Sequence, residues 1–465
     1  MKYLLPILLC LGVQAQAQIS TEHYRGDLEI QGMKIPLILN IEVSDSLDLL
    51  GATLDSPSQN AYGIEANEVV FKQDTLRIAV ARAGIYFTGT YSADRDTLNV
   101  HFKQGYVAER IAMERFDGVV ERPKRPQEPK EPFPYRAEEI AFDNKKDKVS
   151  LAGTLTLPEG EGPFDAVVLV SGSGPQDRNE EIMGHKPFLV IADYLTRNGV
   201  AVLRYDERGV GESTGNFYEA TSLDFAADAS AAVDFMAERS DIRRIGLAGH
   251  SEGGLVGPMV ATQNDELDFL ILLAGPGVPG PEILKLQQVL MAGGEETLTE
   301  ADRKAHKMLE QLYAVPSMLT DAEAVRTRMN EIMDEHIATF SEEELEEIGM
   351  SPMAWKMATV QNLTTPWFLE FMRIRPSDYL SRVTIPVLAI NGTLDMQVDA
   401  EQNLPAIEKQ LIRAGNKQFR IERVKGLNHL FQHAETGLAD EYGTLEETFA
   451  PQVMELMLKW LTSLE

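Results

Sequence analysis

The chain has 465 residues, of which 44% are hydrophobic and 25% charged, and its formal net charge is −29. This length is too great for one ordinary core, since domains usually hold roughly 100–200 residues, and the composition is that of a folded protein. So large an acidic excess repels phosphate groups, which disfavours nucleic acid and anionic membrane surfaces as partners. Solubility explains the excess more simply than selection for a cationic substrate does.

Residues 1–17 have the pattern of a signal peptide. Lys2 precedes an apolar run from Tyr3 to Val13, and Ala15-Gln16-Ala17 follows as an A-x-A cleavage site. The run is shorter than the roughly 20 residues of a spanning helix, so no membrane span is expected. Cys10 raises a lipoprotein as the alternative, but Leu9 precedes it where such sequences carry a small residue. We expect export to a bacterial periplasm or to the outside of the cell.

Cys10 is the only cysteine in the chain. Cleavage after Ala17 would leave a mature protein without cysteine, which excludes structural disulfides, cysteine-ligated zinc and a cysteine nucleophile. No metal and no other cofactor is predicted.

Residues 18–118 alternate between apolar and polar side chains with the period of half-buried strands. Clear examples are 35–43, 69–78 and 85–91, separated by turn residues such as Asp94-Arg95-Asp96. A small all-β domain, either an antiparallel sheet or a small barrel, is predicted. It contains no cluster of histidines or paired carboxylates that suggests chemistry.

The segment 119–136 is predicted to be a linker. Its prolines recur at every third residue, at Pro123, Pro126, Pro129 and Pro132. Three residues per turn is the repeat of polyproline II, which makes a stiff, extended spacer. A ligand for an SH3-type domain is the alternative, and a linker suits an exported protein better.

Short apolar strands alternate with helices over residues 137–465. Unbroken apolar runs of this kind favour a mostly parallel, doubly wound sheet covered on both faces. The expected strands are 166–170, 200–205, 245–248, 269–273, 387–390 and 419–424, and the expected helices include 187–197 and 225–237. Residues 276–384 interrupt this rhythm with helical spacing and an acidic run, 342–347, so a helical lid insertion is predicted there.

Ser251 is the predicted nucleophile. It lies in Gly249-His250-Ser251-Glu252-Gly253, directly after the strand 245–248 and directly before an apolar helix, 255–261. This is the placement of a nucleophile elbow, a sharp turn in which Gly249 and Gly253 avoid collisions. A second G-x-S-x-G, around Ser213, lies six residues beyond its strand with no apolar helix after it, and is interpreted as a loop packed near the site.

A serine hydroxyl needs a general base and a carboxylate that orients this base. In doubly wound hydrolases the chain order is serine, acid, histidine. His429 follows the strand 419–424 in a turn and is the predicted base, while His433 is taken for a surface residue. Asp395 follows the strand 387–390 and is the predicted acid, while Asp399 suits the start of a helix.

The oxyanion hole is expected to combine two backbone N–H groups. One is that of Glu252, after the nucleophile, and the other that of Ser173, in the loop after the strand 166–170. Gly172 and Gly174 let this loop approach a substrate closely. Phosphate binding is the rival interpretation of such a loop, but the spacings of the known phosphate motifs are absent.

Several segments together resemble the carboxylesterase and serine-aminopeptidase branch of the α/β-hydrolase superfamily, and most of all its exported bacterial esterases with an extra amino-terminal domain. They are Ser171–Arg178, Asp206–Ser213, Gly249–Gly254, Gly392–Asp395 and Asn428-His429. The resemblance covers about residues 138–465 and implies hydrolysis of short-acyl esters through an acyl-serine intermediate, without metal or cofactor. The chain departs from many relatives in having Ser171-Gly172 where they have His-Gly.

Three functions follow from this pattern. The first is a carboxylesterase acting on a small-molecule ester, with Ser251, His429 and Asp395 as its triad. The second is an aminopeptidase on the same triad, in which acidic lid residues would bind the free amino group of a peptide. The third is an inactive hydrolase fold that serves as a binding protein. The pattern indicates neither the natural substrate nor an oligomeric state.

Overall fold

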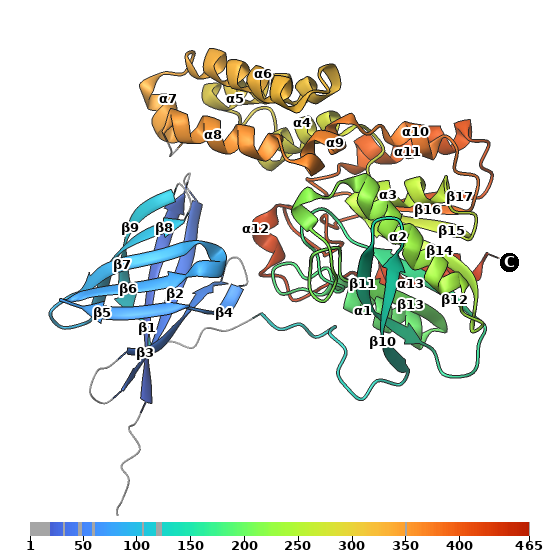
Figure 1. Cartoon of the computed structure of the whole chain (residues 1–465), viewed down its shortest axis with the longest axis horizontal. Coiled ribbons are helices and arrows are strands. Elements are labelled where there is room, and N and C mark those ends of the chain that lie inside the picture. The colour runs from blue at the N-terminus through green and yellow to red at the C-terminus, as the bar shows by residue number, and fades with distance from the viewer. Residues whose placement is uncertain are drawn as a thin grey trace, which may run out of the picture. The chain divides into compact units, whose positions relative to one another are not determined.

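The computed structural model describes residues 19–30, 33–44, 49–57, 61–104, 107–117, 123–348 and 351–464. The predicted signal peptide lies outside these residues. The chain divides into two compact units, Met1–Arg122 and Pro123–Glu465, and both are drawn in Figure 1. The domain boundaries expected from the sequence stay a prediction, and each unit is considered by itself.

The first unit is a nine-stranded antiparallel sheet in the order β4-β3-β2-β1-β9-β8-β7-β6-β5. Alternation along its strands places one face in a core. In β8, for example, Leu98, Val100 and Phe102 are buried, and Phe102 meets Phe87 of β7 edge to face. The strands are β1 (Ile19–Ile30), β2 (Met33–Ser44), β3 (Leu49–Ser56), β4 (Ala61–Glu65), β5 (Glu68–Lys72), β6 (Thr75–Val80), β7 (Ile85–Tyr91), β8 (Thr97–Gln104) and β9 (Val107–Arg115), with a 3₁₀ turn at Ala81–Ala83. The predicted all-β architecture is confirmed.

One predicted strand of this unit is wrong. Residues 69–78 do not form a single strand but the hairpin of β5 and β6. Gln73 and Asp74 form its two-residue turn, with φ of 50° and 59°. Positive φ at both positions matches the right-handed twist of the flanking strands. The sequence does not indicate this turn, because neither position is a glycine or an asparagine, the residues that most often adopt positive φ in such turns.

The second unit contains an eight-stranded sheet in the order β10-β11-β13-β12-β14-β15-β16-β17. β11 pairs antiparallel with both of its neighbours, β10 and β13. From β13 onward in this order, all strands, including β12, run parallel to one another. The strands are β10 (Arg136–Asn144), β11 (Val149–Leu157), β12 (Phe164–Val170), β13 (Val200–Tyr205), β14 (Ile242–His250), β15 (Phe269–Leu273), β16 (Val387–Gly392) and β17 (Phe419–Val424). The predicted mostly parallel, doubly wound sheet is confirmed.

Helices cover both faces of this sheet, as Figure 1 shows. Successive side chains of β12 alternate between two cores: Ala166 and Val168 lie in one, Val167 and Leu169 in the other. The first core is completed by α2 (Ser222–Ala237), α3 (Glu252–Ala261) and α11 (Ala400–Arg413), and the second by α1 (Pro187–Arg197) and α13 (Pro451–Thr462). Two short elements, Phe217–Glu219 and α12 (Ala439–Tyr442), lie in loops.

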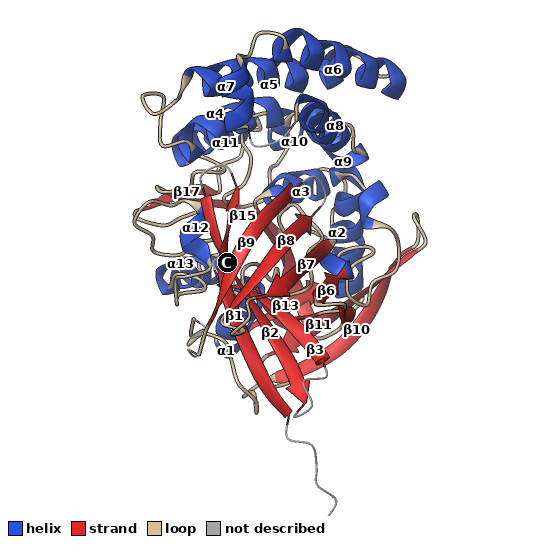
Figure 2. Cartoon of the chain, turned by 90° about the vertical axis from the view of Figure 1, so that its left-hand side faces the viewer, coloured by secondary structure: helices blue, strands red, loops and turns tan. Residues whose placement is uncertain are grey.

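A helical insertion between β15 and β16 confirms the expected lid. Its helices are α4 (Gly280–Met291), α5 (Glu300–Met318), α6 (Ala322–Ile337), α7 (Glu342–Glu347), α8 (Pro352–Leu363), α9 (Pro366–Arg373) and α10 (Pro376–Leu380). Met308, Leu312, Met329 and Met333 of α5 and α6 are fully buried, and they belong to the same apolar core as one face of the sheet. Helices α5–α7 lie farther from the sheet than α9 and α10 (Figures 1 and 2). Within the described ranges, no helix is both long and apolar enough to cross a membrane.

The proline-rich segment from Pro123 onward lies against the second unit. The side-chain amide of Gln127 donates to the Phe449 carbonyl at 2.7 Å and accepts the N–H of Thr448 at 2.6 Å. The hydroxyl of Thr448 in turn bonds with Nδ1 of the fully buried His185 at 2.9 Å. These bonds tie the segment to the loops around α1 and α13.

Candidate active site

Ser251 occupies a sharp turn between β14 and α3. Its φ is 51° and its ψ −115°, a conformation that side chains rarely adopt, and its N–H donates to the Leu273 carbonyl at 2.8 Å. Gly249 and Gly253 lie so close to neighbouring carbonyl groups that a Cβ on either would fall within 3.0 Å of backbone atoms. The turn therefore depends on both glycines and presents the hydroxyl at the carboxyl edge of the sheet.

His429 lies between Ser251 and Asp395. Its Nε2 is 3.1 Å from the Ser251 Oγ, and its Nδ1 is 2.8 Å from the Asp395 Oδ2. The other oxygen of Asp395 accepts the N–H groups of Gln397 and Val398, each at 2.8 Å. With a proton on Nδ1, which faces the acceptor Asp395, Nε2 would be the acceptor that faces the Ser251 hydroxyl. The structure thus brings the three residues together in the order that proton transfer requires.

The loop after β12 lies beside this trio. A Cβ on Gly172 would approach the Ser251 Cβ to 3.1 Å, and Gly174 has a φ of 106°. The N–H of Gly172 already donates to Glu180 Oε1 at 2.6 Å, so it is not free to bind an oxyanion. Ser173 borders the same cavity as Ser251 and Glu252. The N–H of Glu252 opens α3, where the first N–H groups have no intrahelical partner.

A cavity of about 190 Å³ opens above Ser251, between the sheet edge and helices α4 and α9 of the lid. Its wall is mixed: Glu252, Gln287 and Gln397 supply polar groups, while most of the remaining side chains are apolar. The apolar ones are Pro276, Ile283, Leu284, Trp367, Phe371 and Val398. The lid therefore shapes the space in which a substrate would meet the serine.

Glu252 is a buried carboxyl group in the wall of this cavity. One of its oxygens, Oε1, accepts hydrogen bonds from Ser222 Oγ at 2.5 Å and from Trp367 Nε1 at 2.8 Å. Burial raises the pKa of Glu252, and the two donors counteract part of this effect. Since Trp367 belongs to α9, this bond joins the lid to the residue that follows Ser251.

The residues weighed against the predicted trio lie elsewhere or are engaged. His433 has more than half of its side chain exposed and pairs with Glu447 at 2.8 Å. Asp399 caps α11 by accepting the N–H of Gln402 at 2.7 Å. Ser213, in the second G-x-S-x-G, donates to the Asp206 carbonyl at 2.6 Å and accepts the N–H of Ala152. None of the three faces Ser251.

Sequence reasoning missed the polar residues that surround the trio. Glu180 and His250 form a buried pair, Glu207 accepts hydrogen bonds from the loop of Ser173, and Trp367 reaches in from the lid. His250 had a signal, because it adjoins the nucleophile in sequence. Glu180 and Trp367 had none, since only the fold brings them close.

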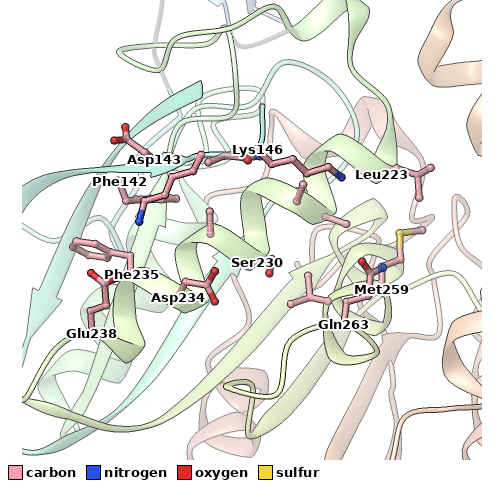
Figure 3. Close-up of a pocket in the computed structure, with 16 residues that line it drawn as sticks. Phe142, Asp143, Lys146, Leu223, Ser230, Asp234, Phe235, Glu238, Met259 and Gln263 are labelled. Carbon is pink, nitrogen blue, oxygen red and sulfur yellow. The ribbon is translucent and has the colours of Figure 1, made fainter. Parts of the chain in front are cut away.

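A second, wider cavity of about 670 Å³ lies between the end of β10 and helices α2 and α3 (Figure 3). Its lining includes Lys146, Asp234 and Glu238 beside the apolar Phe142 and Phe235. None of the predicted site residues borders it. In the part of the chain that the structure describes, no group of three or more histidine, cysteine or acidic residues is placed to hold a metal ion.

The mostly parallel sheet, the elbow and the lid define the second unit as an α/β-hydrolase. Residues 185–436 match the model of the family described as serine aminopeptidase, S33, and the chain belongs to this family. The resemblance inferred from the sequence is confirmed.

Individual relatives are esterases by name. Esterase EstD of Thermotoga maritima is 30% identical over 297 residues, which is 62% of this chain and 60% of EstD. The chain thus matches less than two thirds of the length of EstD. Est1E from Butyrivibrio proteoclasticus, solved with ferulic acid bound, is 20% identical over 70% of this chain and all of its own, with a TM-score of 0.41. The esterase Pf2001 of Pyrococcus furiosus is 15% identical, covers 70% of this chain and 91% of its own, and has a TM-score of 0.41.

Proposed function

We propose that the chain is a serine carboxylesterase that works through an acyl-serine intermediate. His429 Nε2 takes the proton of Ser251 as its Oγ attacks the acyl carbon, and Asp395 stabilises the resulting imidazolium. The N–H groups of Glu252 and Ser173 stabilise the oxyanion. His429 then gives the proton to the leaving alcohol, and a water molecule repeats the cycle to release the acid.

The observation that carries this proposal is the chain of two hydrogen bonds from Ser251 through His429 to Asp395, at 3.1 and 2.8 Å. Nucleophile, base and orienting acid are each within hydrogen-bond reach of the next, as nucleophilic catalysis requires. Membership of a hydrolase family and the name of the relative EstD also support it.

The size of the cavity supports a short acyl group. At about 190 Å³ it is smaller than the roughly 300–1,000 Å³ of sites for drug-sized ligands. Apolar side chains such as Ile283, Leu284 and Phe371 would contact the acyl chain. We expect kcat/KM on p-nitrophenyl esters to be highest for acetate or butyrate and to fall for longer chains.

The test of the nucleophile uses a fluorophosphonate probe, which labels only an activated serine. The folded parent should be labelled, and Ser251→Ala should abolish both labelling and ester hydrolysis. Ser213→Ala is the matched control, because Ser213 has the same sequence motif without a base, and it should leave labelling intact. A parent that stays unlabelled would support the inactive binding protein instead.

A second candidate, an aminopeptidase, is favoured by Glu252. Ser222 and Trp367 both donate to its Oε1, and the residue borders the cavity, so Oε2 is the oxygen that would bind an amino group of a substrate. The family description also names an aminopeptidase. Faster hydrolysis of aminoacyl-p-nitroanilides than of p-nitrophenyl esters would make this the activity of the chain.

We also propose export, which rests on the composition of residues 1–17. Expression in a bacterial host with fractionation, followed by amino-terminal sequencing, tests it. Mature protein in the periplasm that begins at Gln18 would support the proposal, and full-length protein in the cytoplasm would contradict it.

A further inference from the structure

His250, the residue before the nucleophile, faces a hydrogen-bond acceptor with each of its ring nitrogens. Nδ1 is 2.8 Å from Glu180 Oε1, and Nε2 is 2.9 Å from the backbone carbonyl oxygen of His429. A neutral imidazole has one N–H and so can donate to only one of these two partners. Glu180 Oε1 also accepts the N–H of Gly172 at 2.6 Å, which identifies it as an accepting oxygen.

We propose that His250 is a doubly protonated imidazolium paired with the carboxylate of Glu180, and that this pair positions the loop of Ser173 and the loop of His429 around Ser251. The pair acts through its neighbours and does not touch the substrate. Its effect on turnover rests on the proposed function, whereas its charge state does not.

The surroundings of the pair favour two opposite charges over one. Glu180 is 3% exposed and His250 6% exposed, and the small void of about 10 Å³ beside them is otherwise lined by apolar or aromatic side chains. An isolated charge is costly in such a place, and a hydrogen-bonded pair is tolerated. The lining side chains are Pro187, Phe188, Ile191, Leu273, Leu430 and Phe449.

The electrostatics agree with this geometry. Burial by itself lowers the pKa of His250, but the charge and hydrogen bond of Glu180, the His429 carbonyl and the more distant Asp395 outweigh it, so that the pKa is raised. The side chain of His429 is also titratable and lies near the ring, with its centroid 4.9 Å from that of His250. Phe431 meets the ring from a third side at 6.2 Å and carries no charge.

The pair connects two of the parts that the reaction needs. Glu180 fixes the peptide N–H of Gly172, which immediately precedes Ser173, the candidate donor of the oxyanion hole. His250 fixes the main chain of His429, whose ring must stay at 3.1 Å from the Ser251 Oγ. Loss of either bond would let a loop shift by a fraction of an ångström or more, and reaction rates are sensitive to such shifts.

The decisive variant is Glu180→Gln, which keeps the shape and the accepting oxygen of the side chain but removes its charge. Glu181→Gln is the matched control, because Glu181 is the adjacent carboxyl, about half exposed, and pairs only loosely with Lys186 at 3.9 Å. The side-chain nitrogens of ¹⁵N-histidine report the charge of His250 directly, with the signal assigned through His250→Gln. Turnover of p-nitrophenyl butyrate and fluorophosphonate labelling report the positioning.

In the parent at pH 7.5, both ring nitrogens of His250 should be protonated, and Glu180→Gln should convert the ring to the neutral form. We expect kcat to fall about tenfold or more in this variant with little change in KM. The alkaline limb of the kcat profile should move to lower pH, because a less stabilised imidazolium loses its proton sooner. Glu181→Gln should match the parent in all three measurements.

A neutral His250 in the parent at pH 7.5 would overturn the proposal, and so would a Glu180→Gln variant with the kcat and pH profile of the parent. If Glu180→Gln does not fold, the nitrogen signals of the parent still decide the charge state. Absence of fluorophosphonate labelling in the parent would count against the esterase and not against the charged pair.

Discussion

Gly249→Ala should abolish the proposed esterase activity by displacing Ser251. A Cβ at this position would stand within 3.0 Å of the Gly253 carbonyl group, whereas ordinary contact begins at 3.4 Å, and the obstacle is backbone that cannot rotate away. The start of α3 must therefore move by roughly 1 Å or more to restore ordinary contact, and Ser251 moves with it. A displacement of about 1 Å at a reacting group costs roughly 100-fold in rate. We expect kcat/KM on p-nitrophenyl acetate to fall about 100-fold.

Gly257→Ala is the control for this experiment, because it adds the same methyl group at a nearby glycine, in α3 instead of at the end of β14. Its Cβ would meet only the ends of the Leu247 and Leu270 side chains at 3.2 Å, and these can adjust. Replacing glycine by alanine inside a helix also favours the helix by about 1 kcal/mol. This variant should keep its activity within a few-fold and its melting temperature within a few degrees. A Gly249→Ala protein as active as Gly257→Ala would refute the reasoning about the turn.

Three further predictions concern the acid, a buried histidine and the lid. Asp395→Asn should lower kcat by about 10³–10⁴-fold with the fold intact, because an amide cannot hold His429 in its tautomer; a loss below tenfold would count against the role of Asp395. Burial, together with the nearby Arg125, lowers the pKa of His185 from 6.5 to about 4. As the pH falls, the unfolded chain therefore binds a proton at this histidine before the folded chain does. The free energy of unfolding should fall by about 3 kcal/mol as the pH drops from 6.5 to 4. Urea unfolding measured at both pH values should show a smaller loss of unfolding free energy in His185→Gln than in the parent. An equal loss in the two proteins would contradict the role given to His185. Trp367→Phe removes a donor from the buried Glu252 and should lower the unfolding free energy by about 1–3 kcal/mol, whereas Trp355→Phe, at a tryptophan with no such bond among the described contacts, should cost less.

The central strands of the sheet in the second unit were predictable because they are buried on both faces. The runs 200–205 and 269–273 coincide with β13 and β15, which are buried throughout, and the helix 187–197 coincides with α1. The run 419–424 coincides with β17, which forms one edge of the sheet and is only partly buried. The continuous apolar character of 200–205 and 269–273 predicts a central, parallel position for these two strands. The hairpin at Gln73-Asp74 was not predictable in the same way, since its turn is set by backbone twist and not by a distinctive residue.

The convergence of three residues at the candidate site was predictable from the order of strands and loops along the chain. Ser251, Asp395 and His429 each follow a strand at the edge where parallel strands end together, so their convergence needed only the topology. Glu180 and Trp367 follow no such rule. Glu180 meets His250 across 70 residues, and Trp367 meets Glu252 across 115 residues, through loops and lid helices whose packing one sequence does not encode in any local pattern.

The backbone of Ser251 has a thermodynamic consequence for the evolution of this chain. With φ at 51° and ψ at −115°, every residue except glycine is strained here, at a cost of about 1–3 kcal/mol. A mutant with glycine at this point would gain stability and lose its chemistry. If Ser251 acts as proposed, natural selection for its chemistry has to oppose, at this one residue, the drift toward a more stable fold.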